Sequence, residues 1–373
     1  MTIISITITV LYLLLIGSFA FGFDKIKIFK RDALPYKTKF SVVIPFRNEA
    51  ENLAVLIKSI QLLEYPKELF EVLFVDDDSE DDSVEILKNA IENQSNISIL
   101  KNNRTSNSPK KDAISTAIEQ ANNNWIVTTD ADCLLPKNWL NSFDSCIQKT
   151  NATCIAAPVT YIPQNSFLNR FQLLDILSLQ AATIGGFGIN KPFLCNGANF
   201  AYKKELFKEV NGFDGNTHTA SGDDIFMLEK VVKKHPEQLH YLKSEEAIVS
   251  TKAQATWKAL ISQRVRWAAK TSAYNNWFGK FTGLVVLLMN ALIISIGLLA
   301  IFGVFKLKIC LYLVIIKFNI DFLLIYKSAL FFNQKGVLKS FIVGFLLYPF
   351  FSVYVAFISV FSNYNWKGRT FKK

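Results

Sequence analysis

The sequence has few of the side chains from which metal sites and disulfide frameworks are built. Its 373 residues include three histidines and five cysteines. No two of the cysteines are spaced as Cys-x-x-Cys; they are Cys133, Cys146, Cys154, Cys195 and Cys310. This scarcity disfavours a zinc site and a disulfide framework. We expect free, buried thiols in a reducing compartment.

Charge is also absent from long parts of the chain. Residues 1–23, 281–305 and 340–366 contain no charged side chain, and half of all residues are hydrophobic. As a helix, residues 1–23 would span roughly 34 Å at ~1.5 Å per residue, more than a hydrocarbon core of about 30 Å. No basic segment precedes this stretch, which favours an uncleaved anchor over a signal peptide. We therefore expect an N-terminal membrane anchor at residues 1–23 and a C-terminal membrane region at residues 281–366.

A further apolar segment, residues 309–326, is interrupted by two charges. Lys317 and Asp321 are spaced i, i+4, so on a helix they would pair on one face. Such a pair is costly inside a membrane and usually faces protein or water. If this segment crosses, the C-terminal region has three spans and the basic tail lies outside; otherwise it has two spans and the tail lies inside. We favour three spans, because the first helices usually dominate orientation. The tail carries Lys367, Arg369, Lys372 and Lys373.

The net charge is +10, and the basic residues gather beside the apolar segments rather than on a nucleic-acid recognition motif. Cationic flanks hold a protein against anionic headgroups, so we expect membrane lipids and no nucleic acid among the partners. The residues that follow the first apolar segment include Lys25, Lys27, Lys30, Arg31, Lys37 and Lys39. The positive-inside rule makes this side cytoplasmic. We expect an integral protein of the plasma (inner) membrane with a cytoplasmic catalytic domain.

Residues 40–250 alternate between short apolar runs and helical patterns. Strands are expected at residues 40–45, 72–75, 97–100 and 125–129, and helices at residues 50–63, 83–90 and 111–121. This alternation predicts an α/β domain with a mostly parallel sheet and helices on both faces. In such sheets ligands bind at the carboxyl ends of the strands. Residues 254–276 then show the amphipathic spacing of a helix at a membrane interface.

Two acidic clusters follow predicted strands. Asp76 and Asp77, in Val75-Asp-Asp-Asp-Ser79, could accept hydrogen bonds from a nucleobase or ribose. A polar loop that caps the next helix is the alternative. Asp130 and Asp132 are two residues apart, so on an extended backbone both project the same way. Hard carboxylate oxygens suit Mg²⁺ or Mn²⁺, which clamps a diphosphate; a solvated loop is the alternative.

Three further groups are candidates for the chemistry. In Ser221-Gly-Asp-Asp224, a carboxylate at a helix start could act as a general base, or merely as a favourable charge at the helix dipole. In Gln263-Arg-Val-Arg-Trp267, arginine forks could bind phosphate and the Trp could stack on a sugar; lipid headgroups are the alternative partners. Lys110 and Lys111 start a helix and could meet phosphate, or form a solvated surface pair.

The order and spacing of these groups resemble the inverting family 2 glycosyltransferases of the GT-A fold. The shared motifs are Ile44-Pro-Phe-Arg-Asn-Glu49, Val75-Asp-Asp-Asp-Ser79, Asp130-Ala-Asp132, Asn196-Gly-Ala-Asn199 with Asn211-Gly-Phe-Asp214, Gly222-Asp-Asp224 and Gln263-Arg-Val-Arg-Trp267. The QxxRW-type ending is most similar to the membrane-embedded branch, which includes cellulose, hyaluronan and poly-N-acetylglucosamine synthases. Each motif is weak alone, whereas six in order are specific.

The resemblance implies roles for these residues. Asp77, with Asp76 beside it, would contact the donor base, and Pro45, Arg47, Glu49, Lys110 and Asp130 would complete the nucleotide-sugar site. Asp132, with Asp130, would hold the metal. Asp224, beside Asp223, would be the general base, while Gln263, Arg264, Arg266 and Trp267 would close over the diphosphate and acceptor. The sequence departs from the family at Asp78, where the family often has Gly, and at Asp223, where it often has Glu.

The resemblance therefore implies transfer of a sugar, most simply from a UDP-sugar, to a lipid-linked or glycan acceptor. Three alternatives stay open: a processive polysaccharide synthase, a nucleotidyltransferase on a similar fold, and a non-catalytic membrane scaffold. Polymerising members usually carry more membrane helices than the four expected here, and nucleotidyltransferases do not need the Arg-Trp helix.

Overall fold

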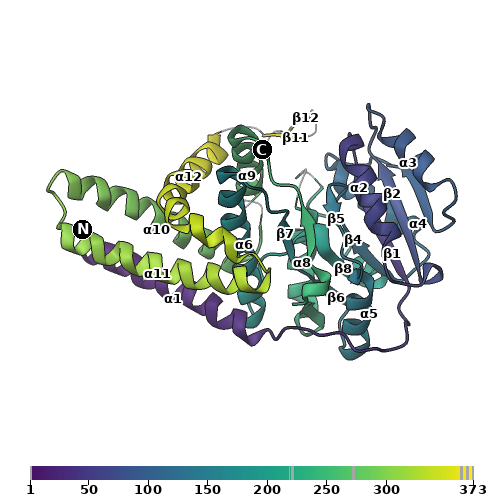
Figure 1. Cartoon of the computed structure of the whole chain (residues 1–373), viewed down its shortest axis with the longest axis horizontal. Coiled ribbons are helices and arrows are strands. Elements are labelled where there is room, and N and C mark those ends of the chain that lie inside the picture. Colours follow the sequence, from purple (N-terminus) through teal and green to yellow (C-terminus); the bar gives the residue numbers. More distant parts are fainter. Residues whose placement is uncertain are drawn as a thin grey trace. The chain divides into compact units, whose positions relative to one another are not determined.

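The computed structural model describes residues 2–217, 219, 222–270, 274–361, 364–366 and 369–371. Ser221 and the tail residues Lys367, Lys372 and Lys373, which the sequence analysis invoked, lie outside the described residues. The chain divides into two compact units. The sheet unit comprises Lys27–Ile162 and Cys195–Lys252, and the helical unit comprises Met1–Ile26, Pro163–Leu194 and Ala253–Lys373. Figure 1 labels the elements of both.

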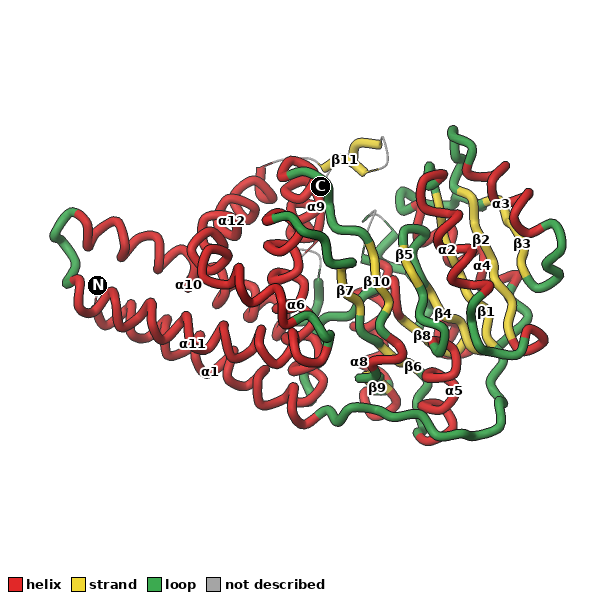
Figure 2. Tube along the Cα trace, viewed as in Figure 1, coloured by secondary structure: helices red, strands yellow, loops and turns green. Residues whose placement is uncertain are grey.

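The sheet unit is built on a mixed sheet of seven strands in the order β3-β2-β1-β4-β8-β6-β9. These strands are β1 (Phe40–Phe46), β2 (Phe70–Asp76), β3 (Ile97–Lys101), β4 (Trp125–Thr128), β6 (Cys154–Ala156), β8 (Phe200–Lys203) and β9 (Leu239–Tyr241). β8 runs antiparallel to its neighbours β4 and β6, and the other pairs are parallel. These pairings confirm the predicted mostly parallel sheet. Figure 2 shows its strands side by side in yellow.

A smaller sheet and six α-helices complete this unit. The smaller sheet contains β5 (Cys133–Leu134), β10 (Val249–Thr251) and β7 (Val159–Tyr161). The helices are α2 (Ala50–Gln61), α3 (Ser83–Ile91), α4 (Pro109–Gln120), α5 (Trp139–Lys149), α7 (Lys204–Glu209) and α8 (Asp223–Lys234). α2 packs against α3, and α4 packs on β1 and β2. The strands and helices expected between residues 40 and 129 are all present.

The core of the sheet unit explains why these elements form where they do. Phe40, Val42 and Ile44 alternate along β1 and are fully buried in one cluster with apolar residues of α2. The α2 residues recur at helical spacing: Leu53, Leu56, Ile57 and Ile60. Every second residue of the strand therefore packs against the apolar face of the helix, whose residues recur every three to four positions. This contact determines which side chains of each element face the core.

The helical unit consists of α1 (Thr2–Lys25), α6 (Phe167–Gly188), α9 (Trp257–Ala269), α10 (Trp277–Ile301), α11 (Leu307–Phe331) and α12 (Phe341–Phe361). Within the described residues, α1, α10, α11 and the segment Lys335–Phe361 are long and apolar enough to cross a membrane. The last helix ends at Phe361 rather than at residue 366, and β11 (Tyr364–Trp366) pairs with β12 (Arg369–Phe371). The four expected apolar segments are therefore helical, and α1 runs beside α11 in Figure 1.

The ion pair predicted between Lys317 and Asp321 is present in α11. Lys317 Nζ lies 2.5 Å from Asp321 Oδ2, and the Lys317 side chain is 2% exposed. The Tyr12 hydroxyl of α1 donates to Asp321 Oδ1 at 2.6 Å. The charges therefore face protein, where each has a partner, as an ion pair between apolar helices requires.

α6 was not expected from the sequence. It interrupts the sequence of the sheet unit and belongs to the helical unit, where it packs against α1. A Cβ on Gly188 would lie 1.9 Å from the Gly22 carbonyl oxygen, and a Cβ on Gly185 would lie 2.4 Å from the Phe19 carbonyl oxygen. Backbones this close require glycine at the crossing.

We predict that Gly188→Ala lowers the stability of the helical unit by about 1–3 kcal/mol, because the added methyl group overpacks the α1–α6 crossing. The matched control is Gly297→Ala in α10, where a Cβ would meet nothing within 4 Å. The measurement is the apparent melting temperature of the detergent-purified protein. Equal melting temperatures for the two variants would show that the crossing is not tight.

Candidate functional site

The predicted acidic clusters lie at the carboxyl ends of neighbouring strands in the sheet unit. Asp76 ends β2 and Asp77 follows it, while Asp130 and Asp132 follow β4. β1 lies between β2 and β4 and runs parallel to both. The parallel strands therefore deliver these carboxylates to the same edge of the sheet, which is where such folds bind ligands.

Asp77 is held by two side chains that the sequence analysis did not select. It is 4% exposed, and its Oδ1 accepts hydrogen bonds from Asn102 Nδ2 at 2.7 Å and from Arg104 Nε at 2.5 Å. Arg104 also lies 3.0 Å from Asp78 Oδ2. Asn102 and Arg104 follow β3, so the rule that sites form at carboxyl ends of strands was the signal that could have found them.

Arg47 and Asp78 shape the loop after β2. Arg47 Nη1 donates to the Asp77 carbonyl oxygen at 2.7 Å, and its Nη2 pairs with Glu80 Oε1 at 2.5 Å. Asp78 has φ +56°, in the left-handed region that glycine adopts most easily. The loop thus has a left-handed residue even though Asp stands where the family often has Gly.

The two other residues expected near the donor have backbone roles in this structure. Pro45 lies in β1 opposite Val75 of β2. Glu49 is the N-cap residue of α2, where its backbone carbonyl oxygen accepts hydrogen bonds from the N–H groups of Asn52 and Leu53. Its Oε2 also accepts a hydrogen bond from Asn52 Nδ2 at 2.5 Å. Their part in ligand binding stays a prediction.

Lys110 brings the second and third acidic motifs together. It lies in the first turn of α4, and its Nζ is 2.6 Å from Asp130 Oδ1 and 3.5 Å from Asp223 Oδ2. Burial would lower the pKa of Lys110, but the carboxylates of Asp130, Asp223 and Asp224 outweigh it and raise the pKa above its usual value. The side chain therefore remains an ammonium ion among carboxylates.

The acidic pair at the start of α8 is positioned by a glycine. Gly222 caps this helix with φ +91°. Asp224 Oδ2 accepts a hydrogen bond from the Gly197 backbone N–H at 3.1 Å, which orients the carboxylate. A Cβ on Gly197 would lie 2.9 Å from Asp223 Oδ2, so a larger residue would displace the pair. This contact gives the Asn196-Gly-Ala-Asn199 motif a physical role at the site.

The donor atoms at the Asp130-Ala-Asp132 turn fit a hard divalent cation. Both carboxylates are partly exposed. Burial, Asp132 and Asp130 raise the pKa of the neighbouring Cys133 thiol, which therefore stays protonated and is a poor ligand. In the described part of the chain, no three Asp, Glu, His or Cys side chains cluster as a metal site. A metal held here would have Asp132 and Asp130 as protein ligands, with oxygens of water or of a bound diphosphate completing its coordination.

The Gln263-Arg-Val-Arg-Trp267 motif lies on a helix, α9, which spans Trp257–Ala269 within the expected residues 254–276 and belongs to the helical unit. Arg264 Nε pairs with Asp175 Oδ2 of α6 at 2.7 Å, and both side chains are buried. The Arg264 guanidinium also lies 4.2 Å from the centre of the Trp267 ring and donates to Gln263 Oε1. In this structure Arg264 is engaged inside the helical unit, while Arg266 is partly exposed.

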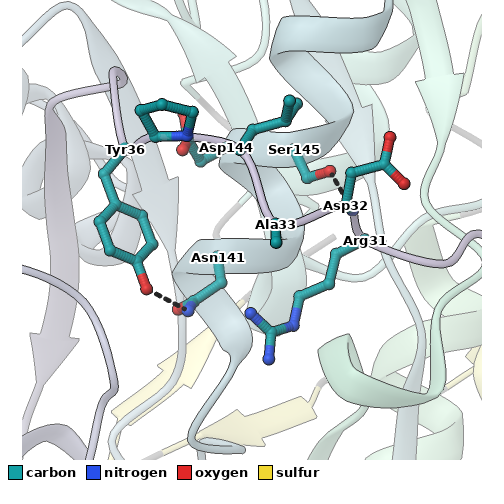
Figure 3. Close-up of a pocket in the computed structure, with 9 residues that line it drawn as sticks. Arg31, Asp32, Ala33, Tyr36, Asn141, Asp144 and Ser145 are labelled. Atoms are coloured by element: carbon teal, nitrogen blue, oxygen red, sulfur yellow. Dashed lines mark hydrogen bonds between the residues drawn. The ribbon is translucent and has the colours of Figure 1, made fainter.

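A separate pocket of about 340 Å³ lies in the sheet unit (Figure 3). Its walls are residues 31–36 and three residues of α5: Asn141, Asp144 and Ser145. The Tyr36 hydroxyl and Asn141 Nδ2 are 3.4 Å apart there. None of the residues selected from the sequence for a site lines this pocket, so the acidic clusters and the pocket are distinct features.

Comparison with known proteins shows what the sheet-forming part of the chain is similar to. Residues 41–211 match the model of the glycosyl transferase family 2. This match supports a family 2 glycosyltransferase domain in that part of the chain. The mannosyltransferase PcManGT from Pyrobaculum calidifontis, solved with GDP-Man and Mn2+, is similar in fold: the TM-score is 0.58 at 17% identity, over 96% of this chain and 99% of that one. The fold is the GT-A fold with apolar helices at both ends of the chain.

Curated relatives are also glycosyltransferases. Glycosyltransferase AglE of Haloferax volcanii is 27% identical over 187 residues, which cover 50% of this chain and 58% of AglE. An undecaprenyl-phosphate 4-deoxy-4-formamido-L-arabinose transferase of Pseudomonas savastanoi pv. phaseolicola is 35% identical over 106 residues, 27% of this chain and 31% of that protein. The chain thus covers less than two thirds of either relative.

We predict that Asp175→Asn destabilises the helical unit by roughly 3–5 kcal/mol, because it leaves Arg264 buried without its counter-charge. A double variant with leucine at both positions should recover most of this loss, since an apolar pair of similar volume needs no counter-charge. The apparent melting temperature in detergent measures both. A stable Asp175→Asn protein would mean that the pair contributes little.

Proposed function

We propose that the protein is an inverting glycosyltransferase that transfers a sugar from a nucleotide-sugar to a lipid-linked or glycan acceptor. The donor that we propose is a UDP-sugar. The transfer takes place at the cytoplasmic face of the plasma (inner) membrane. The observation that carries this proposal is the contact of Lys110 with both Asp130 and Asp223. It gathers the carboxylates of the donor side and those of the acceptor side around one cation.

The donor side uses the carboxyl ends of β2 and β4. Asp77 and Asp76 would recognise the base and ribose, with Pro45, Arg47 and Glu49 shaping that part of the site. Asp132, with Asp130 beside it, would hold Mg²⁺ or Mn²⁺, which neutralises charge on the leaving diphosphate when bound. The fold neighbour with GDP-Man and Mn2+ supports a nucleotide-sugar and a divalent metal as ligands. Lys110 adds a positive charge where the diphosphate departs.

The acceptor side uses the start of α8. Asp224 takes the proton of the acceptor hydroxyl. At the same time the hydroxyl oxygen attacks the anomeric carbon, and the bond from that carbon to the diphosphate breaks. A single displacement of this kind converts an α-linked donor into a β-linked product. The hydrogen bond from the Gly197 N–H holds Asp224 in one orientation, so the base is aligned before the acceptor arrives.

A membrane-bound acceptor would explain why apolar helices accompany the domain. Within the described chain, four helices are long and apolar enough to cross a membrane. The name of one relative, an undecaprenyl-phosphate 4-deoxy-4-formamido-L-arabinose transferase, includes a lipid phosphate, which supports a lipid acceptor here. We assign Arg266 and Trp267 to the diphosphate and acceptor, and Gln263 and Arg264 to holding α9, because Arg264 pairs with Asp175.

The test uses the detergent-purified full chain with Mg²⁺ or Mn²⁺, a panel of nucleotide-sugars and membrane lipid extract. Release of nucleoside diphosphate together with one labelled sugar on a lipid-soluble product is expected. Asp224→Asn should lower kcat by about 10²–10⁴-fold with little change in donor KM, because it removes the general base. A long water-soluble product would indicate a polysaccharide synthase.

Two further outcomes would count against the proposal. A folded protein that releases nucleoside diphosphate from no donor would favour the scaffold. Full turnover by Asp224→Asn would exclude Asp224 as the base.

A further inference from the structure

One lysine near the site has no part in the chemistry proposed above. Lys111 follows Lys110 in the first turn of α4, but its side chain is only 1% exposed. It is therefore not the solvated surface residue that the sequence allowed. A buried ammonium ion is costly unless its N–H groups have acceptors.

The partners of Lys111 come from the segment that leads to the acidic pair. Its Nζ donates to the backbone carbonyl oxygens of Asn216 at 2.6 Å and Thr219 at 2.7 Å. It also lies 4.6 Å from the centre of the Phe226 ring, on α8 two residues after Asp224. The same ammonium group thus contacts the chain on both sides of Asp224.

The two lysines act on α8 from one turn of α4. Lys110 reaches Asp223 directly, and Lys111 reaches the preceding segment and Phe226. Two backbone carbonyl oxygens and an aromatic face are good partners for an ammonium ion. The arrangement fits a tether that fixes where α8 begins.

We propose that Lys111 is a positioning residue, which holds the start of α8 so that Asp224 meets the acceptor hydroxyl in one fixed place. This inference rests on the proposed function of Asp224 as the base. Lys111→Met keeps a similar side-chain volume but removes the donor to the carbonyl oxygens of Asn216 and Thr219, and the loss of these hydrogen bonds lowers stability. A purely stabilising residue would lower the melting temperature alone, whereas a positioning residue would also lower kcat in the folded protein.

The test compares Lys111→Met with Lys230→Met in the full chain. Lys230 donates to the carbonyl oxygens of Gly212 at 2.6 Å and Asp214 at 2.9 Å, so it tethers the same segment farther from the acidic pair. For Lys111→Met we expect kcat of the folded protein to fall by about 10–100-fold at unchanged donor KM, with a lower melting temperature, since small displacements of a catalytic group have effects of this size on kcat. Lys111→Arg should restore part of the rate.

Two results would overturn the inference. One is an unchanged kcat of folded Lys111→Met despite a lower melting temperature, which indicates a purely stabilising role. The other is an equal loss of kcat in Lys230→Met, which indicates general order of the segment.

Backbone hydrogen exchange gives a readout that does not depend on activity. Lys111→Met should speed exchange at the amides around Asn216 and in the first turn of α8, and unchanged exchange would also refute the tether. If the unmodified protein transfers no sugar, the proposed function fails, and the exchange rates still decide whether Lys111 fixes α8.

Discussion

The candidate site depends on one ammonium ion among several carboxylates. Asp130 comes from the end of β4 and Asp223 from the start of α8, and without a cation their charges would repel each other. Lys110, from the first turn of α4, lies within 3.5 Å of both. A single positive charge therefore holds together elements that are distant in the sequence. Because the carboxylates already balance the charge of Lys110, a negatively charged diphosphate could bind here only together with further cations. We therefore expect a divalent metal beside Asp130 and Asp132.

Buried charges in the helical unit are also paired with charges of opposite sign. Arg264 and Asp175 are both buried and paired, and Lys317 and Asp321 are paired with the Tyr12 hydroxyl in reach. The Arg264–Asp175 pair joins α9 to α6, and the Tyr12 hydroxyl joins α1 to Asp321 of α11, so these contacts specify which helices meet. The glycine contact between α1 and α6 adds a second kind of specificity, since it admits no side chain. Paired charges and the close approach of two backbones together determine which helices of this unit pack against each other.

The local parts of this account could be predicted from the sequence. Strands β1 to β4 and the helices between them follow from periodicity, and the acidic motifs fall at strand ends as such sheets require. The Lys317–Asp321 pair follows from its spacing. α6 could not be recognised in the same way, because its polar and apolar residues are spread around the helix rather than on separate faces, and Asp175 has its partner 89 residues away in α9. The burial of Lys111 was equally hidden, since its acceptors lie more than a hundred residues farther along the chain.

The central claim is direct displacement at one site, with Asp224 as the base. The anomeric configuration of the first product tests it most directly, and proton NMR of the product made from an α-linked nucleotide-sugar measures that configuration. The account predicts a β-linked sugar, because a single attack from the side opposite the diphosphate inverts the anomeric carbon. An α-linked product would contradict it, since retention requires a different mechanism from the one that this arrangement of carboxylates supports.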